Sequence, residues 1–182
     1  MFYGNHIRLR AVEREDLPRF VEWFNDPEVR HGLMVYLPMS QAEEERWYEH
    51  MLERPPLERP FAVDARADDA WAHIGGCSLM DTDARSRRAE LGIVIGNKAY
   101  WDRGFGTDVM RTLLRYGFET LNLHRIYLRV FETNPRAIKV YQRVGFTEEG
   151  RLRESHYLQG RYVDTLMMSV LREEWNVMRG SA

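Results

Sequence analysis

The chain has 182 residues, of which 44% are hydrophobic and 30% are charged, a balance typical of a globular protein with one domain. Its net charge of −2 gives no electrostatic support for nucleic-acid binding. It contains no apolar run near the roughly 20 residues that a membrane helix needs, and its single cysteine, Cys77, excludes an intrachain disulfide. We therefore expect one domain over residues 1–182, in the cytoplasm, with no nucleic-acid, membrane or metal partner.

The first third of the chain predicts one strand followed by two helices. Residues 6–12 alternate apolar and polar side chains, as a half-buried strand does. Apolar residues then recur at helical spacing from Leu17 to Phe24, up to a turn at residues 25–28. Ser40 and Glu43 form a capping-box pattern, which predicts that a second helix begins there and ends before the prolines at 55, 56 and 60.

The remainder of the chain predicts further strands and two more helices. One helix follows a pair of glycines and runs to about Leu121, with apolar residues at spacings of three and four. In the other, Asn134 suits the N-cap, Pro135 the first helical position and Gly145 the end. Strands are predicted at 61–65, 73–81, 89–96, 125–132 and on both sides of Gly160. The fold class is therefore α/β, a mixed and mostly antiparallel sheet flanked by helices, in the order β-α-α-β-β-β-α-β-α-β-β.

The stretch YWDRGFGTD places Gly104 and Gly106 directly before a helix. Glycines let the backbone approach a ligand, and a helix N-terminus presents free N–H groups and positive potential to an anion. The loop is not a dinucleotide G-x-G-x-x-G, because Val109 stands at the third glycine, and no Gly-Lys-Ser/Thr of a Walker A loop occurs. Taken alone, such glycines more often serve tight packing than ligand binding.

Two motifs in sequence order make the ligand interpretation stronger. The loop fits Q/R-x-x-G-x-G/A at Trp101, Gly104 and Gly106, with tryptophan in place of the usual Gln or Arg. The pattern N-x-x-A-x-x-x-Y-x-x-x-G-F is matched at Asn134, Ala137, Tyr141, Gly145 and Phe146. Together they resemble the acetyl-CoA-binding core of the GNAT superfamily of N-acetyltransferases, in particular the branch of ribosomal-protein N-terminal and spermidine or polyamine acetyltransferases.

The resemblance covers most of the chain and implies a single N-acetyltransferase domain of GNAT-like fold. Its acetyl-CoA core would span about residues 86–147, and its acceptor-side segments about 14–56. In this family, backbone N–H groups of the loop hold the pyrophosphate, and the strand before the loop pairs with the pantetheine arm. The cofactor-binding residues that the resemblance implies are Ile93, Val94, Ile95, Arg103, Gly104, Phe105, Gly106, Thr107, Asn134, Ala137, Lys139, Tyr141 and Arg143. The basic members of this set have a simpler alternative, as solvated surface charges.

The resemblance also implies catalytic roles. Tyr141 is the expected general acid for the coenzyme A thiolate, with a packed core aromatic as its alternative. Glu90 is the carboxylate candidate for the general base, and its alternatives are a cross-strand ion pair for Glu90 and a water relay for the base. On the acceptor side, Asp26, Glu28 and the run 43–45 would attract a cationic amine, although a run of glutamates at helical positions more simply forms a solvated face.

The expected function is transfer of an acetyl group from acetyl-CoA to a primary amine, by direct attack of the amine. The sequence leaves open whether this amine belongs to a protein N-terminus or to a small molecule such as a polyamine. Two other functions also stay open, a non-catalytic acyl-CoA sensor and an enzyme for another acyl-CoA. Because members of this family often dimerise, a homodimer is a further expectation.

Overall fold

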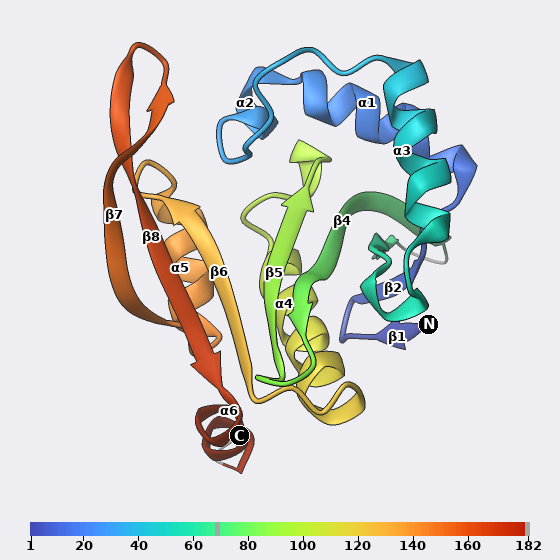
Figure 1. Ribbon diagram of the computed structural model, residues 1–182. Coiled ribbons are helices and arrows are strands. Elements are labelled where there is room, and N and C mark those ends of the chain that lie inside the picture. The colour runs from blue at the N-terminus through green and yellow to red at the C-terminus, as the bar shows by residue number, and fades with distance from the viewer. Residues whose placement is uncertain (68–69, 181–182) are drawn as a thin grey trace. The chain divides into compact units, whose positions relative to one another are not determined.

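The computed structural model describes residues 1–67 and 70–180 (Figure 1). It has the α/β class that the sequence predicts, and hydrogen bonds order the strands β1-β2-β3-β4-β5-β6-β8-β7. Its contacts fall into two compact units. The first comprises residues 1–79 and 92–113, and the second comprises residues 80–91 and the chain from Leu114 onward.

The first unit is built on antiparallel strands, as the early part of the sequence predicts. β1 pairs with β2, β2 with β3 and β3 with β4. The strands are β1 (Phe2–Tyr3), β2 (Ile7–Ala11), β3 (Phe61–Ala67), most of β4 (Ala70–Asp83) and the second half of β5 (Arg88–Ile95). The helices are α1 (Leu17–Asn25), α2 (Pro27–Arg30), α3 (Gln41–Glu53) and most of α4 (Phe105–Arg115), with 3₁₀ turns at Arg14–Asp16, Pro56–Glu58 and Lys98–Tyr100.

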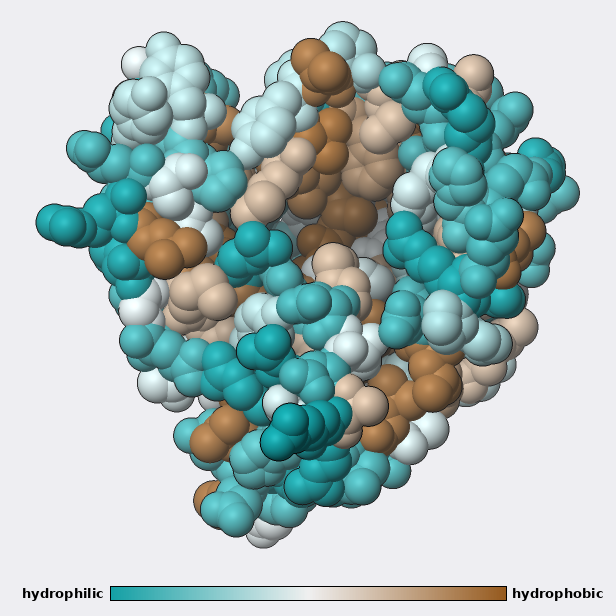
Figure 2. All heavy atoms as spheres, in the orientation of Figure 1, coloured by the Kyte–Doolittle hydropathy of each residue, from teal (hydrophilic) through white to brown (hydrophobic). Residues whose placement is uncertain are grey.

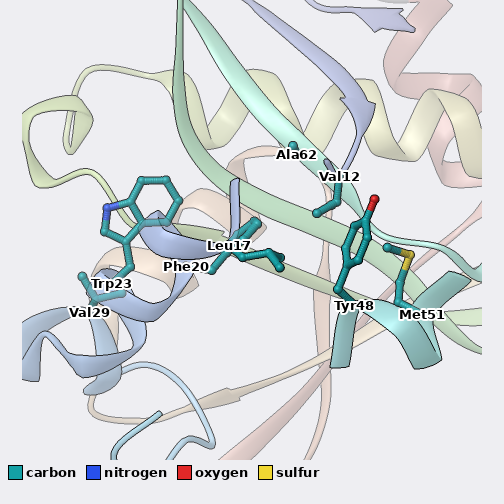
Figure 3. Close-up of a cluster of buried hydrophobic side chains, with 8 residues drawn as sticks. All are labelled: Val12, Leu17, Phe20, Trp23, Val29, Tyr48, Met51 and Ala62. Carbon is teal, nitrogen blue, oxygen red and sulfur yellow. The ribbon is translucent and has the colours of Figure 1, made fainter. Parts of the chain in front are cut away.

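An apolar cluster packs α1 and α3 against the strands of this unit (Figure 3). Leu17, Phe20 and Trp23 recur every third residue of α1 and are all buried. Burying a large apolar side chain contributes about 1.5–3 kcal/mol, so this face holds the helix in place. Half-buried Val94 and Trp101, which both precede the loop glycines in sequence, pack against the same cluster. The cluster consists of Val12, Leu17, Phe20, Trp23, Val29, Tyr48, Met51 and Ala62.

The second unit contains a parallel strand pair. The start of β5 runs parallel to β6, with Glu90 opposite Tyr127, as expected for two strands joined by a helical crossover. β8 pairs antiparallel with β6 and with β7. The elements of this unit are β6 (Arg125–Phe131), β7 (Thr147–Leu158), β8 (Arg161–Leu171), α5 (Pro135–Arg143), α6 (Arg172–Gly180) and a π-helical turn at Tyr116–Thr120.

Three elements are absent from the order that the sequence predicts. β1 has only two residues, too few for an alternating pattern. α2 is one turn, formed because Asp26 caps it and Pro27 starts it, within a stretch that reads as a turn. α6 follows β8 without a break, and buried Trp175 anchors it. The predicted capping box of Ser40 and Glu43 is confirmed at the start of α3.

The surface of the β7–β8 hairpin is polar over most of its length. Figure 2 shows mostly hydrophilic residues over its tip, on the face drawn. β7 lies at the end of the strand order, and all but two of its residues are exposed. In residues 1–67 and 70–180, no helix has the length and apolar composition to cross a membrane.

Candidate active site

The glycine loop of the first unit faces open space. Gly104 has φ of +85°, a conformation that favours glycine, and α4 begins at the next residue. A Cβ atom added at Gly104 or at Gly106 would meet no atom within 4 Å. Two other glycines differ, since a Cβ would lie 2.0 Å from the Val94 oxygen at Gly75 and 2.1 Å from the Trp23 ring at Gly96. The loop glycines are therefore not explained by tight packing, whereas the other two are.

Arg103 is held by its own loop. Its Nη1 donates to the carbonyl of Ala99 at 3.3 Å, and its guanidinium lies 5.5 Å from the ring centres of Tyr100 and Phe105. Cation–π contacts at exposed sites contribute about 0.5–1 kcal/mol. These contacts fit the alternative that Arg103 is a surface charge, and they leave its positive charge beside the start of α4.

Trp101 connects the loop to the end of β5. Its indole Nε1 donates to the carbonyl of Ile95 at 2.6 Å. The tryptophan that departs from the usual Gln or Arg therefore supplies a hydrogen-bond donor to the strand next to the loop. Ile93, Val94 and Ile95 are all half-buried, so their side chains contribute to packing while their backbone lies close to the loop in sequence. A carbonyl accepts two hydrogen bonds, so the Trp101 contact uses one of the two at Ile95.

In the second unit, α5 has the caps that the sequence predicts. The Asn134 side chain accepts a hydrogen bond from the Ala137 N–H at 3.1 Å, and Gly145 ends the helix with φ of +98°. Lys139 and Arg143 are exposed, which fits their alternative as solvated charges. The helix has a strongly apolar side, and yet none of its residues is fully buried.

Tyr141 lies on this half-buried side of α5, with its ring centre 6.0 Å from that of Phe146. Burial raises the pKa of its phenol to about 12. The hydroxyl therefore keeps its proton at neutral pH and can act as a hydrogen-bond donor.

Glu90, also in the second unit, forms the cross-strand ion pair that the sequence offered as its alternative. One carboxylate oxygen accepts from Arg129 Nε at 2.8 Å, and the other accepts from Arg129 Nη2 at 3.1 Å. Both oxygens are engaged by one guanidinium, and only 13% of the Glu90 side chain is exposed. Proton transfer to Glu90 would compete with this bidentate contact.

The two acidic residues near α2 already have a cation. Lys98 Nζ lies 2.7 Å from an Asp26 oxygen and 2.5 Å from a Glu28 oxygen. The hydrogen bond from Lys98 lowers the pKa of Asp26, and the same contacts raise the pKa of Lys98. An acceptor amine would have to compete with Lys98 for these carboxylates.

Comparison with known proteins assigns the family. A family model described as an acetyltransferase (GNAT) domain matches residues 6–147. The chain belongs to the GNAT acetyltransferase family. The spermidine N(1)-acetyltransferase of Vibrio cholerae is 34% identical over 178 residues, which cover 94% of this chain and 96% of that protein. The putative ribosomal N-acetyltransferase YdaF of Bacillus subtilis is 29% identical over 176 residues, 94% of each chain.

Solved structures agree with this assignment. The crystal structure of spermidine N-acetyltransferase from Vibrio cholerae in complex with CoA and spermine has a TM-score of 0.85 and 32% identity, covering 95% of this chain and 99% of that one. The family resemblance inferred from the two motifs is thus confirmed. This GNAT protein is an acyltransferase that moves an acetyl group from acetyl-CoA to an amine. The spermidine acetyltransferase relatives are enzymes, which gives no support to the sensor alternative.

Glu44 corrects the expectation of a solvated glutamate face on the acceptor side of this acetyltransferase. Glu43 and Glu45 are exposed, but only 2% of Glu44 is accessible. Residues four and seven positions apart share one side of a helix, and Glu44 joins Tyr48 and Met51 on the buried side of α3. Burial raises the pKa of the Glu44 carboxyl to about 7.

Replacing Glu44 by glutamine is expected to change how stability depends on pH. The folded pKa of about 7 lies above the ordinary value of 4.5, so wild-type stability falls as pH rises through this window. Glu44→Gln removes that loss, and we expect its advantage over wild type to grow by about 1–3 kcal/mol between pH 5 and pH 8. Thermal unfolding at several pH values measures this.

Glu45→Gln is the matched control, because Glu45 is an exposed neighbour on the same helix. It should follow the wild-type curve at every pH. A gap between wild type and Glu44→Gln that stays constant from pH 5 to pH 8 would contradict the assignment of a raised pKa to Glu44.

Proposed function

We propose that the loop from Arg103 to Thr107 binds the pyrophosphate of acetyl-CoA through its backbone N–H groups. The observation that carries this is the open space at Gly104 and Gly106, where a Cβ would stand between the backbone and a ligand. The N-terminus of α4 adds positive potential at the same place. Ile93, Val94 and Ile95 would offer backbone groups to the pantetheine arm, and Asn134, Ala137, Lys139 and Arg143 would contribute from α5.

We propose that Tyr141 donates a hydrogen bond from its hydroxyl to the sulfur of coenzyme A as the acetyl group leaves. When bound, acetyl-CoA supplies an activated acetyl group as a thioester. A phenol with a pKa of about 12 is a weaker acid than a thiol, whose ordinary pKa is about 8.5. Tyr141 therefore stabilises the negative charge on sulfur, and the proton that finally neutralises it derives from the attacking amine.

The amine must lose a proton before it attacks, because an alkylamine has a pKa of about 10.4 and is charged at neutral pH. Of the two routes that the sequence leaves open, we favour a water molecule as the first acceptor of this proton. Glu90 remains the carboxylate candidate, and its contact with Arg129 makes it better suited to orient that water than to keep the proton.

For the acceptor, we propose a polyamine. The relatives at 28–34% identity that support this include spermidine N(1)-acetyltransferases from two bacteria, and a related structure was solved with CoA and spermine. The competing acceptor, a protein N-terminus, is supported by YdaF at 29% identity. Both are amines, so the chemistry above is the same for each.

An acceptor panel tests this choice. Thiol release from acetyl-CoA is measured with spermidine, spermine, an amino sugar, and short peptides that begin with Ser or Ala. The expected result is turnover with the polyamines at least about tenfold faster, in kcat/KM, than with the peptides. Turnover with peptides alone would replace the polyamine by a protein N-terminus.

The homodimer and the cytoplasmic location also stay proposals. An exposed edge strand offers unpaired backbone groups to a second chain, and β7 exposes Leu152 and Tyr157 by 49% and 61%. A monomeric mass in light scattering coupled to size exclusion would contradict the homodimer.

A further inference from the structure

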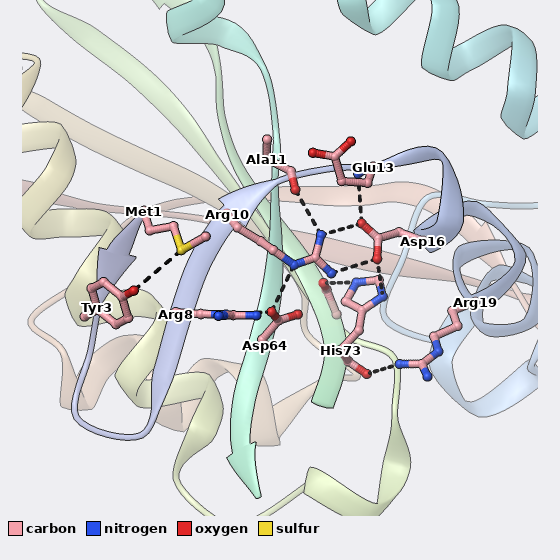
Figure 4. Close-up of polar contacts among 11 residues, drawn as sticks. Met1, Tyr3, Arg8, Arg10, Ala11, Glu13, Asp16, Arg19, Asp64 and His73 are labelled. Atoms are coloured by element: carbon pink, nitrogen blue, oxygen red, sulfur yellow. Dashed lines mark hydrogen bonds and ion pairs between the residues drawn. The ribbon is translucent and has the colours of Figure 1, made fainter. Parts of the chain in front are cut away.

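His73, a buried histidine of the first unit, forms a hydrogen bond to the backbone of its own strand, β4 (Figure 4). His73 is 5% exposed, and its Nε2 is 2.9 Å from the carbonyl oxygen of Gly75, two residues further along β4. A carbonyl only accepts, so Nε2 carries the proton in this contact. The ring packs edge-on against Phe20 and Trp23, with centres 5.1 and 4.9 Å apart. Its other nitrogen, Nδ1, lies 3.2 Å from an oxygen of Asp16.

The histidine spans a β-bulge. In the pairing of β3 with β4, Val63 lies opposite Gly75, but the next residue, Asp64, lies opposite His73. Ile74 is therefore an extra residue without a partner on β3. The hydrogen bond from His73 to Gly75 closes over this residue and holds the bulge in shape.

The bulged residue Ile74 forms hydrogen bonds with the residues that follow β5. The carbonyl of Ile74 accepts hydrogen bonds from the N–H groups of both Gly96 and Asn97, at 2.9 and 3.1 Å. These are the first two residues after β5, on the way to the glycine loop. Trp23 makes a second connection, because it contacts the His73 ring on one side and leaves no room for a Cβ at Gly96 on the other.

A charged network lies beside the Nδ1 side of the histidine, as Figure 4 shows. Asp16 accepts two hydrogen bonds from Arg10, at 2.6 and 2.7 Å, and Asp64 accepts from both Arg8 and Arg10. These contacts place the Asp16 carboxylate at Nδ1 of His73. Burying so many polar groups costs stability, and a packed apolar core would need none of them.

We propose that His73 is a positioning residue for acetyl-CoA. Its Nε2 holds the carbonyl of Gly75, this keeps Ile74 bulged, and the bulged carbonyl fixes where β5 ends and the chain turns toward the loop. The inference rests on the proposed acetyl-CoA site at β5 and the glycine loop. All the residues in this chain of contacts belong to the first unit.

Two substitutions of His73 by an amide side chain separate its contact with Gly75 from its contact with Asp16. In His73→Gln, the side-chain amide reaches as far as Nε2 and can still bind Gly75. In His73→Asn, it reaches only as far as Nδ1, so it retains the Asp16 side and loses Gly75. We expect His73→Asn to raise Kd and KM for acetyl-CoA by about tenfold with kcat within about threefold, and His73→Gln to stay within about threefold of wild type in all three.

Amide hydrogen exchange gives a readout that does not depend on acetyl-CoA. In His73→Asn, the amides of Gly96 and Asn97 should exchange about tenfold faster than in His73→Gln, while amides of β2 exchange equally in both. Met51→Ala is the control for lost packing, because Met51 belongs to the same apolar cluster but lies on α3 and is not one of the residues that connect His73 to the end of β5. It should lower the melting temperature without changing Kd.

Equal Kd values for folded His73→Asn and His73→Gln would overturn the proposal, and so would a rise in Kd for Met51→Ala as large as that for His73→Asn. If wild type bound no acetyl-CoA, the proposed function would fail, and the exchange rates of Gly96 and Asn97 would then decide alone whether His73 fixes the end of β5.

Discussion

Replacing Tyr141 by phenylalanine is expected to lower kcat by a factor of about 100 or more and to leave the Kd for acetyl-CoA within about threefold of wild type. The substitution removes one hydroxyl and keeps the ring that packs beside Phe146. If that hydroxyl stabilises charge on sulfur only as the acetyl group leaves, its loss affects the transition state and not the bound ground state. Stopped-flow thiol release and calorimetry measure the two quantities separately.

Tyr157→Phe is the matched control, because Tyr157 is an exposed tyrosine of the same unit. It should behave as wild type in both measurements. The pH profile adds a second check: with a phenol pKa of about 12, wild-type activity should not decline below about pH 11 through ionisation of Tyr141. A Tyr141→Phe enzyme with wild-type kcat would exclude Tyr141 from the chemical step.

Replacing Gly106 by valine is expected to weaken acetyl-CoA binding by about 100-fold without loss of stability. Apart from the adjoining helix backbone, no protein atom lies within 4 Å of the added Cβ, so the fold has no reason to resist the side chain, whereas a ligand at the loop would meet it. Gly106→Ala should make the contrast sharper, because alanine in a helical turn stabilises a protein by about 0.5–1 kcal/mol relative to glycine. We expect it to raise the melting temperature and the Kd together.

Gly150→Val is the control for this pair. Gly150 also has open space at its Cβ position, but it lies on β7 and is not one of the proposed site residues. It should leave Kd unchanged. Calorimetry that finds wild-type affinity in Gly106→Val would show that the pyrophosphate does not bind at this loop.

Features encoded by neighbouring residues were predictable from the sequence. Asn134, Pro135 and Gly145 determine the ends of α5 because caps act on the backbone within a few residues. The spacing of the two GNAT motifs is also local to each motif, which is why the family and the acetyl-CoA chemistry could be inferred before the structure.

Features set by distant residues were not predictable. Glu44 is buried because α1 and the cluster around it cover one side of α3, and nothing in the run of three glutamates indicates which one turns inward. His73 lies in an apolar strand pattern, and its importance depends on a bulge that only the pairing with β3 creates. The donor role of Trp101 likewise depends on where β5 ends.

The ion pairs of Lys98 have a consequence for self-modification. The chain has only two lysines, and Lys98 lies six residues before Gly104, so an acetylating enzyme carries its own primary amine next to the proposed donor site. Asp26 and Glu28 raise the pKa of Lys98 and keep it as an ammonium ion, which has no lone pair with which to attack a thioester. The same two carboxylates thus disfavour acetylation of Lys98.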